Sequence, residues 1–310
     1  MSEAIVSRRT WVEGRPAAYS TAGSGPPVLL LHGWALNDRA YREVIDAIAT
    51  QGAHVYAPAL PGFGGTGDLP RAQFSIEGYA RWVASFVAAL EIDEPLVVVG
   101  HSFGGGVAIR YAHGAADHVR ALVLVNSVGG SAWGSGGTVR SIAERPLWDW
   151  GLHFPADVFP VRQATRVLPV LAEGIVPNLM RNPRAIVRVA GLARRADLRQ
   201  QVEELRDRDL PITILWGKRD GVIPRESFEA LCVAAGVEGT ELEGSHSWLL
   251  ADPGRLGEVI TNSLAVARLA EKLSDESPPA ESPDDGAKAE RPAKRRSPLR
   301  LRTLVGRRSA

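Results

Sequence analysis

Three residues of this sequence carry side chains that together could perform nucleophilic catalysis. Ser102 stands in the run VVVGHSFGGG, Asp220 in ILWGKRDGVIP and His246 in ELEGSHSWLL. A serine hydroxyl is a poor nucleophile until a base takes its proton, and that base must be held by a third group. A serine, an acid and a histidine in this chain order could therefore attack a carbonyl carbon and form a covalent intermediate.

The serine lies in a glycine-rich break after an apolar run. Gly100-His101-Ser102-Phe103-Gly104 matches G-x-S-x-G, in which a serine occupies a strained turn between a strand and a helix. Side chains at the flanking positions would clash there, and glycine avoids the clash. The pattern is weak by itself in a chain with 32 glycines, but VVV before it and small residues after it supply the strand and the helix start. The alternative is a tight turn with an incidental serine.

Asp220 follows an apolar segment that is typical of a strand, and His246 follows the short segment TELEG, the last predicted strand. Both would lie at the carboxyl ends of strands, which is the edge at which Ser102 is also expected. Asp220 could instead be an ordinary turn residue, because Gly221 follows it. The other histidines lie in glycine motifs, at the ends of predicted elements or in the strand-poor part of the chain: His32, His54, His101, His113, His118 and His153.

Attack on a carbonyl also requires hydrogen-bond donors that stabilise the negative charge developing on the carbonyl oxygen. The backbone amide of Phe103, directly after the serine, is one candidate. The second is expected from the loop after the apolar run VLLL, where His32-Gly33-Trp34 stands, and the Trp34 amide is the better candidate there. The sequence thus predicts an oxyanion hole made of the backbone N–H groups of Trp34 and Phe103.

Apolar strands alternate with helical patterns along most of the chain. This alternation predicts an α/β fold with a mostly parallel sheet and helices on both of its faces. A hairpin around Glu13-Gly14 adds antiparallel strands at one edge. The segments typical of parallel strands are VLLL, HVYAPAL, LVVVG, ALVLVNS, PITILWG and TELEG.

The alternation is interrupted between residues 131 and 208. That stretch is typical of short helices, so we expect a helical lid inserted above the sheet's carboxyl edge, with residues 1–130 and 209–273 forming the core. Aromatic side chains of the lid or next to His246 could line an apolar acyl pocket, or equally could attach the lid to the core. The pocket candidates are Trp133, Trp148, Phe154 and Trp248.

Composition narrows the class of protein further. The chain has 310 residues, of which 45% are hydrophobic, and a net charge of +1, so nothing points to a nucleic-acid partner. Its single cysteine, Cys232, excludes an intrachain disulfide and a cysteine-built metal site. There is no secretory leader and no apolar run long enough to span a membrane, so a cytoplasmic protein is expected.

The last segment, residues 274–310, differs from the rest in composition. It is rich in proline, serine and charge, acidic first and then basic, which predicts disorder. Its basic end KRRSPLRLRTLVGRR could make a weak contact with an anionic membrane. The favoured interpretation is a solvated end without such a partner, and the oligomeric state is left open.

Taken together, these segments resemble the α/β-hydrolase superfamily, in the group with a helical cap. The matching pieces are LLLHGW, LPGFGGTG, VVVGHSFGG, ILWGKRDGVIP and GSHSWLLADP, in family order. The resemblance implies an eight-stranded, mostly parallel sheet and the catalytic triad Ser102, Asp220 and His246. It further implies hydrolysis of a carboxylic ester with a small or medium acyl group through an acyl-enzyme, with neither a metal nor an organic cofactor.

Three positions depart from the usual pattern of relatives. Ala59 replaces a frequent aspartate, Ser245 replaces the usual glycine before the histidine, and His101 stands where carbon–carbon bond hydrolases usually have asparagine. Ser102 argues against haloalkane dehalogenases and epoxide hydrolases, which use an aspartate at the elbow. The remaining alternatives are a carbon–carbon bond hydrolase or a perhydrolase of the haloperoxidase type with the same triad, and a ligand-binding member without catalysis.

Overall fold

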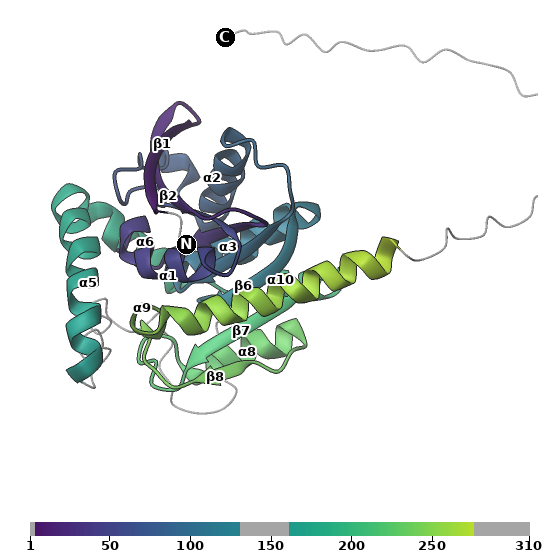
Figure 1. Ribbon diagram of the computed structural model, residues 1–310. Helices are drawn as coiled ribbons and strands as arrows, with labels where there is room; N and C mark the ends of the chain where they lie inside the picture. The colour runs from purple at the N-terminus through teal and green to yellow at the C-terminus, as the bar shows by residue number, and fades with distance from the viewer. Residues whose placement is uncertain (1–3, 131–160, 276–310) are drawn as a thin grey trace, which may run out of the picture.

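The computed structural model describes residues 4–130 and 161–275, and its centre is one eight-stranded sheet (Figure 1). The strand order is β1-β2-β4-β3-β5-β6-β7-β8. Strands β3 to β8 run parallel, whereas β2 pairs antiparallel with both β1 and β4, so the prediction of a mostly parallel sheet with an edge hairpin is confirmed. The strands are β1 (Val6–Val12), β2 (Arg15–Ala22), β3 (Pro27–Leu31), β4 (His54–Pro58), β5 (Leu96–His101), β6 (Val119–Val125), β7 (Ile212–Gly217) and β8 (Thr240–Leu242).

The central strands are apolar on both sides because both faces of the sheet are covered. In β5, Leu96 and Val98 belong to one buried cluster, while Val97 and Val99 belong to the cluster on the opposite face. This alternation follows from the pleat, in which successive side chains point to opposite faces. It explains why the strand before Ser102 reads as an unbroken run of valines.

Helices cover the two faces in two groups. Helices α1 and α10 pack against each other, and their apolar side chains join the cluster that contains Val97 and Val99. Helices α2, α3, α7 and α8 contribute to the other cluster. The bounds are α1 (Arg42–Ala49), α2 (Ile76–Ala89), α3 (Phe103–Gly114), α7 (Arg199–Arg206), α8 (Arg225–Ala235) and α10 (Pro253–Asp275).

The stretch expected to form a lid leaves and rejoins the core at one place. Gly129 and Gly130 form bridges with Asp197, and the Leu198 amide donates to the Gly129 carbonyl at 2.8 Å. Between these points the structure describes α5 (Val161–Arg181) and α6 (Pro183–Ala193), and α5 stands at the side of the body in Figure 1. Helix α7 lies in the range expected for the lid but packs against α3 and α8.

Several residues singled out in the sequence lie outside the described ranges. The pocket candidates Trp133, Trp148 and Phe154 lie there, as does the tail from residue 276 onward. Within residues 4–130 and 161–275, no helix combines the length and the apolar character needed to cross a membrane.

Candidate active site

Ser102 forms a sharp turn between β5 and α3. Its φ of 54° and ψ of −118° lie in a region that side-chain-bearing residues rarely adopt. Three backbone hydrogen bonds hold it there: the Ser102 amide donates to Val125 at 3.0 Å, and its carbonyl accepts from Gly105 at 3.0 Å and Val128 at 3.2 Å. Such strain persists only where the surroundings over-determine it, and it places the hydroxyl at the carboxyl edge of the sheet.

The glycines of this turn are required by close backbone approach. A Cβ added to Gly104 would lie 2.3 Å from the Leu31 carbonyl oxygen and 2.6 Å from that of His32. A Cβ on Gly100 would lie 2.5 Å from the Gly105 Cα. These neighbours are backbone atoms, which cannot rotate away, so the helix can begin beside the serine only with glycine at these positions.

Replacing Gly104 by alanine is therefore expected to destabilise the fold by about 2 kcal/mol or more, the usual cost of forcing extra volume into a packed core. Urea unfolding monitored by circular dichroism measures this. Gly114→Ala, at the other end of α3, is the matched control, since a Cβ there meets nothing within 4 Å. We expect the control to change stability by less than about 1 kcal/mol, and an equal effect of both substitutions would contradict the steric explanation.

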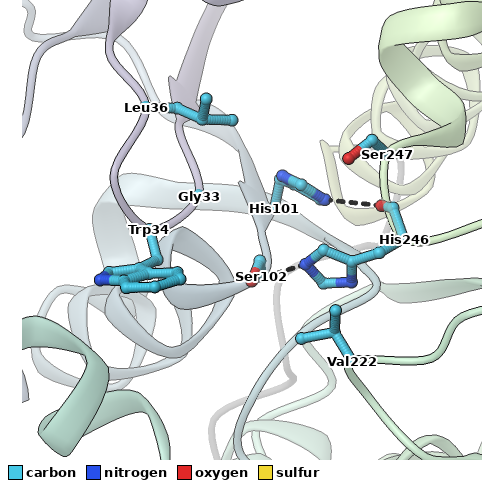
Figure 2. A pocket seen from close by; sticks show the side chains of 8 residues that line it. All are labelled: Gly33, Trp34, Leu36, His101, Ser102, Val222, His246 and Ser247. Atoms are coloured by element: carbon cyan, nitrogen blue, oxygen red, sulfur yellow. Dashed lines mark hydrogen bonds between the residues drawn. The ribbon is translucent and has the colours of Figure 1, made fainter. Parts of the chain in front are cut away.

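The structure brings Ser102, His246 and Asp220 into one hydrogen-bonded chain. His246 Nε2 lies 3.0 Å from Ser102 Oγ (Figure 2), and His246 Nδ1 lies 2.9 Å from Asp220 Oδ2. The other carboxylate oxygen of Asp220 accepts the amides of Val222 at 2.7 Å and Ile223 at 2.8 Å. With the carboxylate accepting, Nδ1 of the imidazole donates to it, and Nε2 is left as the acceptor that faces the Ser102 hydroxyl.

The elements that carry these residues explain their meeting. Asp220 follows β7, His246 follows β8, and Ser102 follows β5, and all three strands are parallel, so their carboxyl ends share one edge. The three side chains are buried, and Asp220 has a side-chain exposure of 0%. Burial excludes competing water and strengthens the electrostatic interaction between the carboxylate and the imidazole.

Asn126, which sequence reasoning missed, anchors the histidine loop. Its Nδ2 donates to the His246 carbonyl at 3.0 Å and to the Ser245 carbonyl at 3.3 Å. Its Oδ1 accepts the Gly217 amide and the indole N–H of Trp248, both at 3.1 Å. The sequence feature that could have indicated this role is the position of Asn126, a polar residue directly after strand β6 and therefore at the same sheet edge as the triad candidates.

His101 and Tyr41 form a second buried chain behind the first. The Gly33 amide donates to the Tyr41 hydroxyl at 2.9 Å, and that hydroxyl lies 2.6 Å from His101 Nδ1. His101 Nε2 lies 3.0 Å from the His246 carbonyl (Figure 2). Burial lowers the pKa of His101 well below its ordinary value, so the ring is neutral and donates from Nε2. His101 therefore links the loop of Gly33 to the loop of His246.

The two expected oxyanion donors lie beside Ser102. Phe103 opens α3, so its amide belongs to the first turn, whose N–H groups have no acceptor within the helix. Gly33 and Trp34 lie on the side of Ser102 opposite His246 (Figure 2). The Gly33 amide is already directed to Tyr41, which leaves the next amide of this loop, that of Trp34, as the candidate.

A small cavity of about 20 Å³ opens between these groups, with room for about one water-sized group. Its described lining combines the serine, both histidines and the Gly33 loop: Gly33, Trp34, Leu36, His101, Ser102, Val222, His246 and Ser247. Trp248, predicted to line a pocket, is not part of this described lining. Its indole is buried in the core, 3.1 Å from the position of a Cβ on Gly217, and its N–H donates to Asn126.

His32 is a buried histidine outside the hydrogen-bonded chain of Ser102, His246 and Asp220. Its Nδ1 donates to the Gly33 carbonyl at 2.8 Å, and its Nε2 accepts the Leu60 amide at 2.8 Å. Burial lowers its pKa from 6.5 to about 4, which keeps the ring neutral. The ring therefore fixes the start of the loop that carries Gly33 and Trp34, the candidate oxyanion loop.

This shift predicts a loss of stability in acid. Because the pKa is lower in the folded state, the unfolded chain binds the proton first as the pH falls, and destabilisation accumulates from about pH 6.5 down to about 4. For His32 the expected loss in unfolding free energy between pH 7 and pH 5 is about 2 kcal/mol. Urea unfolding at both values measures it. The loss should shrink in His32→Gln, which does not titrate, and an unchanged slope in that variant would contradict the assignment.

Comparisons with known proteins agree with this architecture. Residues 26–167 match the family model of the alpha/beta hydrolase fold. An uncharacterized protein of Mycobacterium tuberculosis is 30% identical, covering 84% of this chain and 81% of its own. A pimeloyl-(acyl-carrier protein) methyl ester esterase of Vibrio vulnificus is 25% identical, covering 76% of this chain and 92% of its own. A solved structure of a meta-cleavage product hydrolase from Pseudomonas fluorescens IP01 has a TM-score of 0.66 at 20% identity, covering 84% of this chain and 98% of that one.

Each of these proteins is a relative or a structural neighbour, and together they include an ester hydrolase and a hydrolase of another substrate class. The sheet order, the strained serine turn at the end of β5 and the match over most of the length of a relative all agree. The chain belongs to the α/β-hydrolase fold family.

Proposed function

We propose that this protein is a serine hydrolase that cleaves a carboxylic ester of a small or medium acyl group through an acyl-enzyme. The observation that carries the proposal is the hydrogen-bonded chain from Ser102 Oγ through His246 to Asp220, with both links at 3.0 Å or less. Such a chain supplies a nucleophile, a base and an orienting carboxylate within reach of each other.

In the first half of the reaction, Ser102 Oγ attacks the carbonyl carbon of the ester while His246 Nε2 takes the hydroxyl proton. The carbonyl π electrons move to oxygen, and the amides of Trp34 and Phe103 donate to the resulting oxyanion. Asp220 accepts from Nδ1 and stabilises the imidazolium. The C–O bond to the alcohol then breaks, and the alkoxide leaves with the proton from Nε2, which completes the acyl-enzyme.

In the second half, water replaces the alcohol. His246 Nε2 takes a proton from the water, whose oxygen attacks the acyl carbon. The tetrahedral intermediate collapses, the bond to Ser102 Oγ breaks, and the serine regains its proton from His246. The sum is ester plus water giving acid plus alcohol, and no electrons are exchanged with any cofactor.

The cap helices are proposed to select the acyl group. Helix α6 reaches the candidate oxyanion loop directly, because the indole N–H of Trp34 donates to the Ile186 carbonyl at 2.7 Å. Helix α5 packs against the short helix Asp38–Tyr41 that follows this loop. Substitutions in α5 and α6 are thus expected to shift chain-length preference.

A substrate panel tests this proposal. p-Nitrophenyl esters of increasing acyl length are compared with vinylogous diketones, which report carbon–carbon bond hydrolysis, and with peracid formation from acetate and peroxide. The proposal expects turnover of esters with an optimum at short or medium length. Turnover of the diketones alone would replace it with the carbon–carbon assignment, and no turnover in any arm would favour a ligand-binding member.

A further inference from the structure

We propose that Asn178, on helix α5, is a positioning residue that fixes the direction of the Trp34 amide and so couples the cap to the oxyanion hole. The inference rests on the proposed function, because it concerns the stabilisation of a tetrahedral intermediate on Ser102. It assigns a role in the chemical step to a residue outside the core of the fold.

Asn178 is a buried amide that uses its whole side chain to join three separate segments. Its exposed fraction is 2%. Nδ2 donates to the Ala35 carbonyl at 2.9 Å and to the Leu36 carbonyl at 3.0 Å, and Oδ1 accepts the Gly64 amide at 3.0 Å. One side chain of α5 therefore holds both the loop after β3 and the loop after β4.

The loop that it holds has a backbone that needs external support. Ala35 has a φ of 60°, in the left-handed region that costs a residue with a side chain about 1–2 kcal/mol. Ala35 and Leu36 are 2% and 3% exposed. Without Asn178, two carbonyls in this buried loop would lose their hydrogen-bond donor, which would favour rearrangement.

The support reaches the Trp34 amide through a single peptide plane. The Leu36 amide donates to the Gly33 carbonyl at 3.3 Å, which closes the turn that Asn178 holds from its other end. The Gly33 carbonyl and the Trp34 N–H belong to the same planar trans peptide and point in opposite directions. Whatever fixes the Gly33 carbonyl therefore also fixes the Trp34 N–H.

Other contacts hold this peptide from the core side. His32 Nδ1 also donates to the Gly33 carbonyl, and the Gly33 amide donates to Tyr41. The core thus holds Gly33 at the start of the turn, and Asn178 holds Ala35 and Leu36 at its end. Oxyanion stabilisation depends on donor direction, and a misplacement of about 1 Å costs about 100-fold in rate. Loss of the contacts from Asn178 is therefore expected to lower kcat.

The test uses Asn178→Asp, which keeps the size of the side chain and the acceptor for Gly64 but replaces the donor that faces Ala35 and Leu36. The matched control is Asn182→Asp, in the same part of the chain. Asn182 Nδ2 donates to Asp68 at 3.1 Å and its Oδ1 accepts the Ala185 amide at 3.1 Å, so it contacts a body loop but not the oxyanion loop. Both full-length proteins are compared with wild type below their melting temperatures.

Three quantities are measured: kcat and KM for the best p-nitrophenyl ester, and the inhibition constant of an alkyl trifluoromethyl ketone, which forms a reversible tetrahedral adduct with serine. Asn178→Asp is expected to lower kcat and to raise the inhibition constant by about tenfold or more each, with KM changed less than about twofold. Asn182→Asp is expected to leave kcat and the inhibition constant within about threefold.

Equal effects of the two substitutions, or an effect of Asn178→Asp on KM alone, would overturn the inference while leaving the proposed function intact. A wild-type protein that neither turns over esters nor binds the ketone would overturn the proposed function, and the inference with it. Should Asn178→Asp fail to fold, Asn178→Ser keeps one hydroxyl donor and is expected to show the same kcat and inhibition pattern at smaller size; an unchanged pattern there would also count against the inference.

Discussion

Replacing Ser102 by alanine is expected to lower kcat for any ester that the wild-type protein hydrolyses by about 10⁶-fold, the scale seen when a triad nucleophile is removed. The methyl group of alanine cannot attack a carbonyl, and the remaining hydrogen-bond donors can only polarise the substrate for attack by water. Steady-state kinetics with a p-nitrophenyl ester measures the loss, with protein prepared in parallel to exclude contaminating esterase.

Ser127→Ala is the matched control for this experiment. Ser127 is a buried serine in the segment after β6, where its hydroxyl donates to the Val128 carbonyl at 2.7 Å. It has no place in the proposed proton path, so we expect kcat to change by less than about tenfold. Retention of substantial activity by Ser102→Ala, or an equal loss in both variants, would contradict the assignment of Ser102 as the nucleophile.

Replacing Asp220 by asparagine is expected to lower kcat by about 10⁴-fold while the protein stays folded. The amide oxygen can continue to accept the Val222 and Ile223 amides, which keeps the loop in place. The amide NH₂ then faces His246 Nδ1 and donates to it, so the imidazole proton moves to Nε2. An imidazole in that tautomer cannot accept the proton of Ser102.

The fold of Asp220→Asn is checked by thermal unfolding, and its kinetics by the same ester assay. A kcat within about tenfold of wild type would mean that another group orients His246. A large loss of kcat together with a melting temperature far below that of wild type would point to a structural role for Asp220 in the loop after β7.

The sheet and the proximity of the three triad candidates could be predicted because both depend on the local pattern of apolar and polar residues along the sequence. Strands β3 to β7 are mostly apolar, and parallel strands bring their carboxyl ends together by geometry. Ser102 directly follows β5, Asp220 lies just beyond the end of β7 and His246 just beyond the end of β8, so their neighbourhood follows from topology. Their catalytic roles remain a proposal.

Residues whose importance arises from long-range contacts could not be predicted in this way. Tyr41 lies near a helix start, and its hydroxyl matters only because His101, 60 residues away, points at it. Asn178 lies in a helix with no motif around it, and its partners are 142 and 143 residues distant. Neither spacing nor composition carries this information.

The position of Trp248 could not be predicted for a related reason. Proximity to His246 in sequence suggested proximity to the substrate, but a short helix, α9 (Trp248–Ala251), begins at that residue and turns the indole into the core. Which way a side chain leaves a four-residue helix is decided by packing. Here the glycines at 217 and 244 leave the space that the indole fills.

Mass spectrometry of the folded protein after reaction with a fluorophosphonate tests the central claim most directly. Activated serines attack this reagent, and the phosphonyl group stays on the nucleophile. The account predicts one adduct per chain, located on Ser102, absent from Ser102→Ala, and abolished by prior denaturation. A folded protein that takes up no label, or that carries the label on another residue while ester hydrolysis stops, would contradict it.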